Sequence, residues 1–308
     1  MIEVHELTKR YGPTLAVDGL SFRVHPGRVT GFLGPNGAGK TTTMRLVLGL
    51  AAPTAGEALV DGVPYRRLRR PLRHVGALLD AGHVHGGRSA HDHLLAIARS
   101  NGIGRARVRE VLELAGLDGV ARARVGGLSL GMRQRLGIAM ALLGDPATLL
   151  FDEPTGGLDP EGIRWIRGLL RSLAAEGRTV LVSSHLMSEM ALTAEQVVVI
   201  GRGRLIADTS VAELVRAGSP GGVLVRSSRP ADLAAALAAA GATVAAADGG
   251  LVVTGMDAAA VGELAAARGI ALAELTPRSA SLEEAFMRLT DDSVEYRSDA
   301  PAHPGREA

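Results

Sequence analysis

The stretch GPNGAGKTTT, residues 34–43, follows the apolar run VTGFL, residues 29–33, and places three glycines and a proline around one lysine. Its spacing matches the phosphate-loop pattern G-x-x-x-x-G-K-[ST]. Glycines let backbone amides close around phosphate oxygens at the start of a helix. The stretch therefore predicts a nucleotide site between a strand and a helix. The residues expected to contact phosphate are Gly34, Pro35, Asn36, Gly37, Ala38, Gly39, Lys40, Thr41 and Thr42.

Two side chains of this loop carry specific chemistry. Lys40 is one of only two lysines in the chain, with Lys9, and adds a positive charge toward the β and γ phosphates. The hydroxyl of Thr41 is a ligand for Mg²⁺. A glycine-rich turn that matches by chance is the alternative, and the strand before and helix after the loop argue against it.

Two adjacent acids end the apolar run ATLLF, residues 147–151. Such a run is typical of a strand buried on both faces of a parallel sheet. Asp152 is placed to hold Mg²⁺ through water, and Glu153 to orient a water for attack on the γ phosphate. The sequence therefore predicts an ATPase site rather than a solvated acidic turn.

Composition bounds the class of protein. With 308 residues and 46% hydrophobic content, one large domain and a smaller one are expected. The net charge of +2 favours no nucleic-acid partner. The absence of cysteine excludes disulfides and thiol chemistry, and fits a cytoplasmic location. The charged N-terminus, MIEVHELTKR, argues against a signal peptide that would direct secretion of this chain. No stretch has the roughly 18 uninterrupted apolar residues that a membrane span requires.

Apolar strands alternate with amphipathic helices up to about residue 217, which predicts an α/β domain with a mostly parallel sheet. Asp159 and Pro160 are expected to cap and begin one of its helices, and KTTTMRLVLGL, residues 40–50, to form another. After Gly218 the chain becomes alanine-rich. Its pattern up to residue 290 is βαββαβ, which predicts a ferredoxin-like α+β appendage. Residues 291–308 are expected to be a disordered tail.

The segment LSLGMRQR, residues 128–135, brings Ser129 as a helix cap and Gly131, where a backbone can approach a ligand. Four motifs in order, the phosphate loop, LSLGMRQR, LLFDEPTGGLD (149–159) and SSH (183–185), resemble the ATP-binding subunit of an ABC transporter. The resemblance covers residues 1–217 and implies a P-loop ABC cassette with an antiparallel β-subdomain and a helical subdomain at about 85–145. PRSASLEEAFMRLT, residues 277–290, resembles ABC-2 type drug exporters of the daunorubicin-resistance kind.

This resemblance implies a head-to-tail homodimer with ATP and Mg²⁺ between the two copies. Tyr11 would stack on adenine, and Ser129 and Gly131 would reach the γ phosphate held by the other copy. His185 would bind the γ phosphate and the attacking water, and Asp159 would contact the partner. We expect a catalytic set of Lys40, Glu153 and His185, and a metal set of Thr41, Asp152 and Asp80.

Two positions depart from the family pattern. Asp80 ends the segment HVGALLD (74–80), where the family usually has a glutamine that touches Mg²⁺ and reports to the membrane partner. Its carboxylate can ligate Mg²⁺ but adds repulsion near a triphosphate. Leu130 and Met132 replace a glycine and a glutamine of the signature segment, while Ser129 and Gly131 are kept.

Two further clusters have alternative interpretations. His83, His85, His91 and His93 invite a metal site, but His91 and His93 would face opposite ways on a helix. The run YRRLRRPLRH, residues 65–74, is expected to be a solvated face, with a lipid-binding patch as the alternative.

The leading hypothesis is an ATP-hydrolysing subunit at the inner face of the cell membrane that powers export through a separate transmembrane permease. One alternative is a soluble ABC ATPase that acts on ribosomes or DNA. A nucleotide-binding module without turnover is a third, and Glu153 argues against it.

Overall fold

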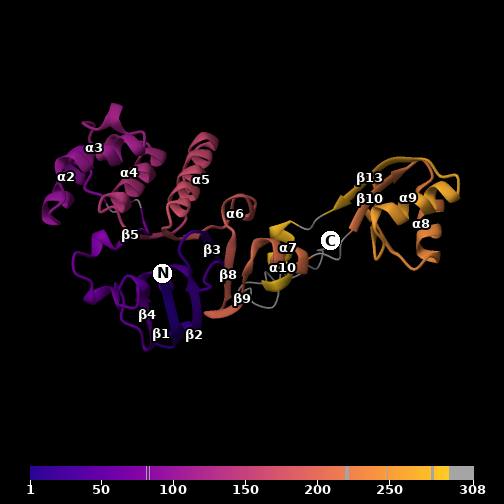
Figure 1. Ribbon diagram of the computed structural model, residues 1–308, viewed down its shortest axis with the longest axis horizontal. Coiled ribbons are helices and arrows are strands. Elements are labelled where there is room, and N and C mark those ends of the chain that lie inside the picture. Colours follow the sequence, from indigo (N-terminus) through magenta and orange to yellow (C-terminus); the bar gives the residue numbers. More distant parts are fainter. Residues whose placement is uncertain (81, 83, 219–221, 248, 279–280, 291–308) are drawn as a thin grey trace, which may run out of the picture. The chain divides into compact units, whose positions relative to one another are not determined.

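The computed structural model describes residues 1–80, 82, 84–218, 222–247, 249–278 and 281–290 (Figure 1). It divides into two compact units, Met1–Asp208 with Thr290, and Thr209–Leu289. His83 and the tail expected from residue 291 lie outside the described residues. The sequence places the domain boundary after residue 217, and that placement stays a prediction.

The first unit is built on a six-stranded sheet. Its order is β5 (Val75–Leu78), β6 (Thr148–Phe151), β7 (Thr179–Ser183), β3 (Val29–Leu33), β8 (Gln196–Gly201) and β9 (Arg204–Ser210). The pairs from β5 to β8 are parallel. All residues of β3, β6 and β7 are buried, which explains their near-continuous apolar sequences. The predicted α/β class with a mostly parallel sheet is confirmed.

Parallel strands bring distant parts of the chain to one edge of this sheet. In the register of the sheet, Phe32 of β3 lies beside Ser183 of β7, and Phe151 of β6 lies beside Val182. The segments that follow these strands therefore leave from the same edge, where open α/β sheets place their ligands.

The helix after β3, α1 (Lys40–Val47), is shorter than predicted. The sequence extends it to Leu50, but Gly49 takes a left-handed conformation with φ of 62°. The amide of Gly49 then donates to the carbonyl of Leu46 at 3.0 Å. This turn ends the helix in the way that glycine commonly does.

A second sheet in this unit is antiparallel, with the order β2 (Thr14–Val24), β1 (Ile2–Tyr11) and β4 (Ala55–Val60). One cluster of buried side chains joins it to α1 and to the parallel sheet, and includes Val4, Leu20, Phe22, Met44, Leu46, Phe32 and Leu181. The phosphate loop is thus anchored between two sheets.

Three helices, α2 (Ala90–Ser100), α3 (Arg105–Leu114) and α4 (Leu130–Leu142), form a group beside β5 (Figure 1). Helix α4 approaches β5 closely because Gly137 has no Cβ, which would lie 2.6 Å from Leu78. Helix α5 (Pro160–Ala175) begins after Asp159, as predicted. Helix α6 (Met187–Thr193) follows β7. Short 3₁₀ turns cover Tyr65–Arg67, Pro71–Arg73, Asp118–Val120 and Val125–Gly127.

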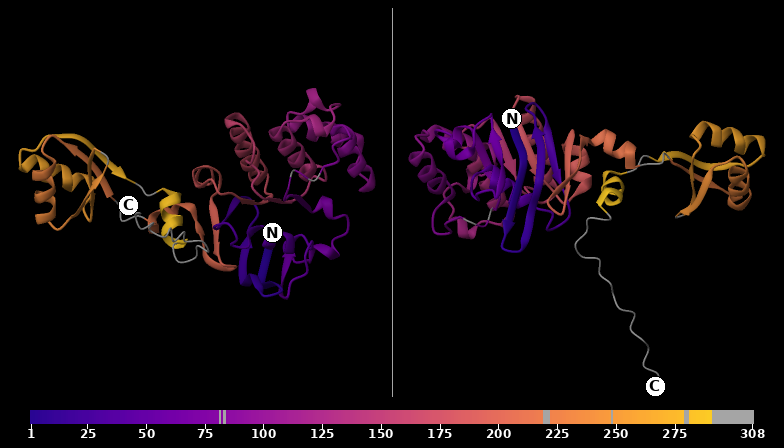
Figure 2. Two further views of the ribbon diagram at one scale, coloured as in Figure 1. Left: turned by 180° about the vertical axis from the view of Figure 1, so that it is seen from behind. Right: turned by 90° about the horizontal axis from the view of Figure 1, so that it is seen from below.

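The second unit contains the predicted βαββαβ order. Its elements are α7 (Val211–Gly218), β10 (Gly222–Ser227), α8 (Pro230–Ala239), β11 (Thr243–Ala247), β12 (Gly250–Thr254), α9 (Ala258–Ala267), β13 (Leu272–Arg278) and α10 (Leu282–Thr290). The strand order β11-β12-β10-β13 is antiparallel throughout, so the ferredoxin-like prediction is confirmed. Helices α8 and α9 cover one face of this sheet (Figure 2).

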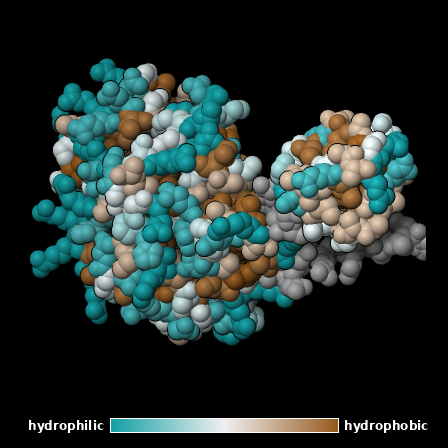
Figure 3. Space-filling model, turned by 45° about the vertical axis from the view of Figure 1, so that its right-hand side comes forward, coloured by the Kyte–Doolittle hydropathy of each residue, from teal (hydrophilic) through white to brown (hydrophobic). Residues whose placement is uncertain are grey.

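The two units differ in surface character. On the face shown in Figure 3, the second unit is mostly pale brown because alanine dominates its helices, whereas charged side chains colour much of the first unit teal. In the described part of the chain, none of the helices has the length and apolar character needed to cross a bilayer.

His93 on α2 provides a test of how the helical group is packed. Its side chain is buried, and neither ring nitrogen has a hydrogen-bond partner among the described residues. Burial lowers the pKa of His93, and the charges of Arg88 and His85 lower it further. The unfolded chain therefore takes up a proton on this histidine near pH 6.5, while the folded chain does not. The contribution of His93 to the free energy of unfolding is fully present above about pH 6.5 and is lost as the pH falls.

We expect the melting temperature of the first unit to fall between about pH 7 and pH 5.5, and to fall less in His93→Leu. Differential scanning calorimetry at both values measures this. His25→Leu, at an exposed histidine, is the control and should behave as the wild type. An equal pH dependence in His93→Leu and wild type would contradict the assignment.

Candidate nucleotide site

The loop between β3 and α1 depends on glycine at two positions. A Cβ on Gly39 would lie 2.5 Å from the carbonyl oxygen of Ala16, and one on Gly34 would lie 2.5 Å from that of Ile200. Gly39 also has a φ of 102°, which favours glycine. The close packing of the loop against its neighbours therefore explains why these two glycines are needed.

A cavity of about 310 Å³ lies over this loop. Ala16, Leu79 and the two acids at the end of β6 contribute to its wall. The N-terminus of a helix carries unpaired amides and a partial positive charge, which favour an anion. The rest of the wall is the loop and the first turn of α1: Asn36, Gly37, Ala38, Gly39, Lys40, Thr41 and Thr42. The cavity is suited to a chain of phosphate groups.

The ammonium of Lys40 is held by the loop itself. Its Nζ donates to the carbonyl oxygens of Gly34 at 2.6 Å and Pro35 at 3.1 Å. Burial lowers the pKa of Lys40, and the negative charges of Glu153 and Asp152 oppose this shift. Phosphate oxygens would be stronger, charge-assisted acceptors for the same donor.

Asp152 joins the helix after the loop to two strands. Its Oδ2 accepts a hydrogen bond of 2.6 Å from Thr41 Oγ1, and its Oδ1 accepts one of 2.5 Å from Ser183 Oγ. Mg²⁺ prefers oxygen ligands of this kind, usually with several waters retained. Thr41 and Asp152 therefore fit a magnesium ion.

Glu153 is held from several sides in an unusual backbone conformation. Its φ is 49°, a region that costs a non-glycine residue about 1–3 kcal/mol. Its amide donates to Ser183 Oγ at 3.0 Å, and its carbonyl accepts from Gln134 Nε2 at 3.2 Å. Its Oε2 lies 2.6 Å from His185 Nδ1. The side chain is 34% exposed, so a carboxylate is presented to water next to the phosphate cavity.

The structure thus brings Lys40, Thr41, Asp152, Glu153 and His185 into one site. Ser183 and Gln134 were not predicted as members of it. Ser183 is fully buried at the end of β7 and bonds to both acids, so it is a positioning residue. The available signal was a hydroxyl side chain at the end of a buried strand, SSH after TVLV, but its partners belong to β6.

The remaining predicted residues are not among those that line the phosphate cavity. Tyr11 is 49% exposed at the end of β1, with Lys9 Nζ 4.8 Å from its ring centroid. Ser129 caps α4 by accepting from Met132 at 3.2 Å. Asp159 caps α5 by accepting from the Gly162 amide at 2.7 Å. Both capping roles are confirmed, and the roles of these residues and of Gly131 toward a second copy stay predictions.

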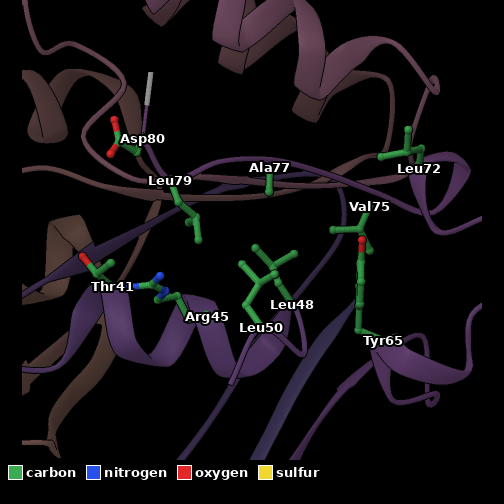
Figure 4. Close-up of a pocket in the computed structure, with 10 residues that line it drawn as sticks. All are labelled: Thr41, Arg45, Leu48, Leu50, Tyr65, Leu72, Val75, Ala77, Leu79 and Asp80. Carbon is green, nitrogen blue, oxygen red and sulfur yellow. The ribbon is translucent and has the colours of Figure 1, made fainter. Parts of the chain in front are cut away.

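A second hollow, a groove of about 490 Å³, adjoins the phosphate cavity (Figure 4). Thr41 and Leu79 line both. Its floor is apolar, and burial raises the pKa of Tyr65. Asp80 accepts a hydrogen bond of 2.6 Å from the Gly82 amide, while Leu79 points into the groove. The other lining residues are Arg45, Leu48, Leu50, Leu72, Val75 and Ala77.

The two clusters with alternative interpretations can also be located. The five arginines of YRRLRRPLRH are exposed, and Arg66 donates to the Gly49 carbonyl at 2.9 Å. His91 Nδ1 lies 3.1 Å from Asp92 Oδ1. Across the described ranges, no three histidine or acidic side chains converge in a way that could hold a metal ion.

The fold and this site define a nucleotide-binding protein of the phosphate-loop class. A family model described as "ABC transporter" matches residues 17–156. A second model, a domain of unknown function (DUF8746), matches residues 221–283, within the second unit.

Similar proteins support a closer assignment. The bacitracin transport ATP-binding protein BcrA of Bacillus licheniformis is 43% identical over 209 residues, which are 67% of this chain and 68% of that protein. The Nod factor export ATP-binding protein I of Paraburkholderia xenovorans (strain LB400) is 43% identical over 219 residues, 70% of this chain and 72% of that protein. This chain belongs to the family of ABC transporter ATP-binding proteins.

Solved structures agree with this assignment. The dimeric structure of MJ0796, a bacterial ABC transporter cassette, is 25% identical with a TM-score of 0.63. The match covers 68% of this chain and 98% of that one. The predicted ABC cassette fold is confirmed.

The glycine geometry of the loop leads to a binding test. Gly39→Ala should weaken ATP binding by more than about tenfold for two reasons. The new Cβ would displace the backbone at Ala16, and an alanine with a positive φ costs about 1–2 kcal/mol. Gly27→Ala is the matched control, with a φ of 80° and open space around the new Cβ. Titration with a fluorescent ATP analogue measures affinity, and thermal unfolding measures stability. Equal affinities in the two variants would contradict this role of Gly39.

Proposed function

We propose that this chain hydrolyses ATP with Mg²⁺ and thereby powers a membrane transporter. The observation that carries the proposal is the Glu153 carboxylate, held 2.6 Å from His185 and beside the phosphate cavity. A carboxylate in this position can orient and deprotonate water. A module that only binds nucleotide would not require it.

Each residue then has a defined part. Lys40 and the loop amides hold the β and γ phosphates and offset their charge. Thr41 and Asp152 would hold Mg²⁺, which would supply further neutralisation of the phosphate charge. Glu153 takes a proton from the water molecule while the oxygen of that water forms a bond to the γ phosphorus. His185 steadies Glu153 and the γ phosphate, and the bond to the β-phosphate oxygen breaks to leave ADP and phosphate.

We infer that two copies assemble head to tail around ATP. Ser129 and Gly131 of one copy would meet the γ phosphate on the other, Asp159 would contact the partner and Tyr11 would stack on adenine. The 37% exposure of Met132, beside the Ser129–Gly131 turn, supports burial of this turn by a second chain. ATP binding would close the dimer, and hydrolysis would reopen it.

We further propose that the groove beside the cavity receives a separate membrane-spanning permease, which would place this chain at the inner face of the cell membrane. Its apolar floor and the 65% exposed Leu50 support a protein partner. The names of the relatives, bacitracin transport and Nod factor export, support export as the direction. An ABC-2 exporter of the daunorubicin-resistance kind remains the proposed subgroup, from residues 277–290.

The catalytic assignment predicts a specific defect in Glu153→Gln. The amide cannot accept the proton of water, so kcat should fall by about 10²–10⁴. ATP binding should persist, and ATP should produce a stable dimer in sedimentation velocity. Glu176→Gln, an exposed acid at the end of α5, is the control. Hydrolysis by Glu153→Gln at the wild-type rate would rule out Glu153 as the base.

The docking groove predicts a defect in partner recovery. In the Glu153→Gln background with Mg²⁺ and ATP, Leu50→Asp should lower the amount of polytopic membrane protein recovered from solubilised membranes of the native cell by about tenfold, because a charge would be desolvated on docking. Leu205→Asp, at an exposed leucine on β9, is the control. Mass spectrometry measures the recovery. Equal recovery with both variants would place the permease elsewhere.

A further inference from the structure

The first turn of α4 and the loop from Glu153 to Asp159 are in direct contact within one chain. A Cβ on Gly157 would lie 2.4 Å from both Cγ and Cδ2 of Leu130. The leucine side chain therefore occupies the space that a side chain at position 157 would need. Gly131 also lies near this loop, since its Cβ position is 3.0 Å from the Gly157 carbonyl oxygen. Gly157 itself has a φ of 74°, a left-handed conformation.

The contacted loop leads directly to the catalytic carboxylate. It consists of two overlapping turns, in which Gly156 donates to the Glu153 carbonyl at 3.1 Å and Leu158 donates to the Thr155 carbonyl at 3.1 Å. Gln134, one helical turn beyond Leu130 and 6% exposed, donates to the same Glu153 carbonyl at 3.2 Å. Helix α4 therefore contacts the loop at its middle, through Leu130, and at its start, through Gln134.

We propose that Leu130 is a positioning residue that couples the Ser129–Gly131 turn to Glu153 of the same chain. The proposal rests on the proposed function, in which that turn senses the ATP of the other copy while Glu153 acts on ATP held by its own phosphate loop. A displacement of the turn pushes Leu130 against Gly157, and the tight loop transmits the displacement to the backbone of Glu153. Occupancy of one ATP site thereby adjusts the carboxylate that serves the other.

The choice of side chain matters to this coupling. A glycine at position 130 would leave no side chain between the turn and Gly157, and would leave the loop to the contacts of Gln134 and Gly131. The leucine side chain is 55% exposed, but its Cγ and Cδ2 occupy the space beside Gly157, and displacement is transmitted where atoms are in contact. The conformation of Glu153, with a φ of 49°, makes the carboxylate sensitive to small shifts of the loop.

The first test separates catalysis from binding. Leu130→Ala should lower kcat by about fivefold and change the KM for ATP by less than about twofold, because Leu130 touches the loop and not the phosphate cavity. Leu130→Met, with a similar volume, should keep most of the wild-type kcat. Leu114→Ala, at an exposed leucine of α3, is the matched control. A KM change without a kcat change, or a Leu130→Met variant as impaired as Leu130→Ala, would overturn the proposal.

The second test is a double-mutant cycle with Gly157. Gly157→Ala should lower kcat by about tenfold or more in the wild type, where the new methyl group meets Cγ and Cδ2 of Leu130. In the Leu130→Ala background those atoms are gone and the nearest, Cβ, is 3.3 Å away, so Gly157→Ala should lower kcat by at least about threefold less than in the wild type, while the strain of its φ of 74° is common to both backgrounds. Additive effects of the two substitutions would show that the residues do not act together.

A third measurement excludes a role at the dimer surface. In the Glu153→Gln background, Leu130→Ala should leave ATP-dependent dimer formation unchanged in sedimentation velocity. Loss of the dimer would mean that Leu130 acts on the partner chain, and would overturn the proposal. Failure of the proposed function is recognised separately: the wild type would then lack ATPase activity, or Glu153→Gln would keep it.

Discussion

The carboxylate of Asp152 is the contact on which the site depends. It accepts hydrogen bonds from Thr41 on α1 and from Ser183 on β7, and so ties the phosphate loop to the ends of two strands. Ser183 in turn holds the amide of Glu153, which is bonded to His185. The buried parallel strands make this arrangement possible, because their register brings chain segments over a hundred residues apart to one edge. The same contacts offset the backbone strain at Glu153.

Those parts of the molecule that rest on local patterns could be predicted from the sequence. The phosphate loop, the acids after β6 and the caps Ser129 and Asp159 are each defined by a few neighbouring residues, and their capping bonds span three residues. The βαββαβ order of the second unit could be predicted for the same reason. Short apolar runs between turns and alanine-rich helices set its periodicity before any long-range contact is considered.

Features that depend on contacts between distant segments could not be predicted. Ser183 and Gln134 look like an ordinary strand end and an ordinary helix residue, and become part of the site only through β6–β7 pairing and through α4 reaching Glu153. Helix α6 and strands β8 and β9 were not recognised as separate elements. The early end of α1 depended on the conformation of Gly49, whose residue type alone permits but does not require a left-handed turn.

The departures from the family pattern acquire a physical meaning when their neighbours are considered. Leu130 stands where the family pattern has a glycine, and it lies against Gly157, which has no side chain to clash with it. Leu130 and Gly157 are complementary in size, because the leucine side chain occupies the space that the glycine leaves. A substitution that looks disruptive in the sequence is thus accommodated by a glycine 27 positions later. The Ser129 cap and the close approach of Gly131 are kept because both rest on the backbone of α4, which the leucine side chain does not disturb.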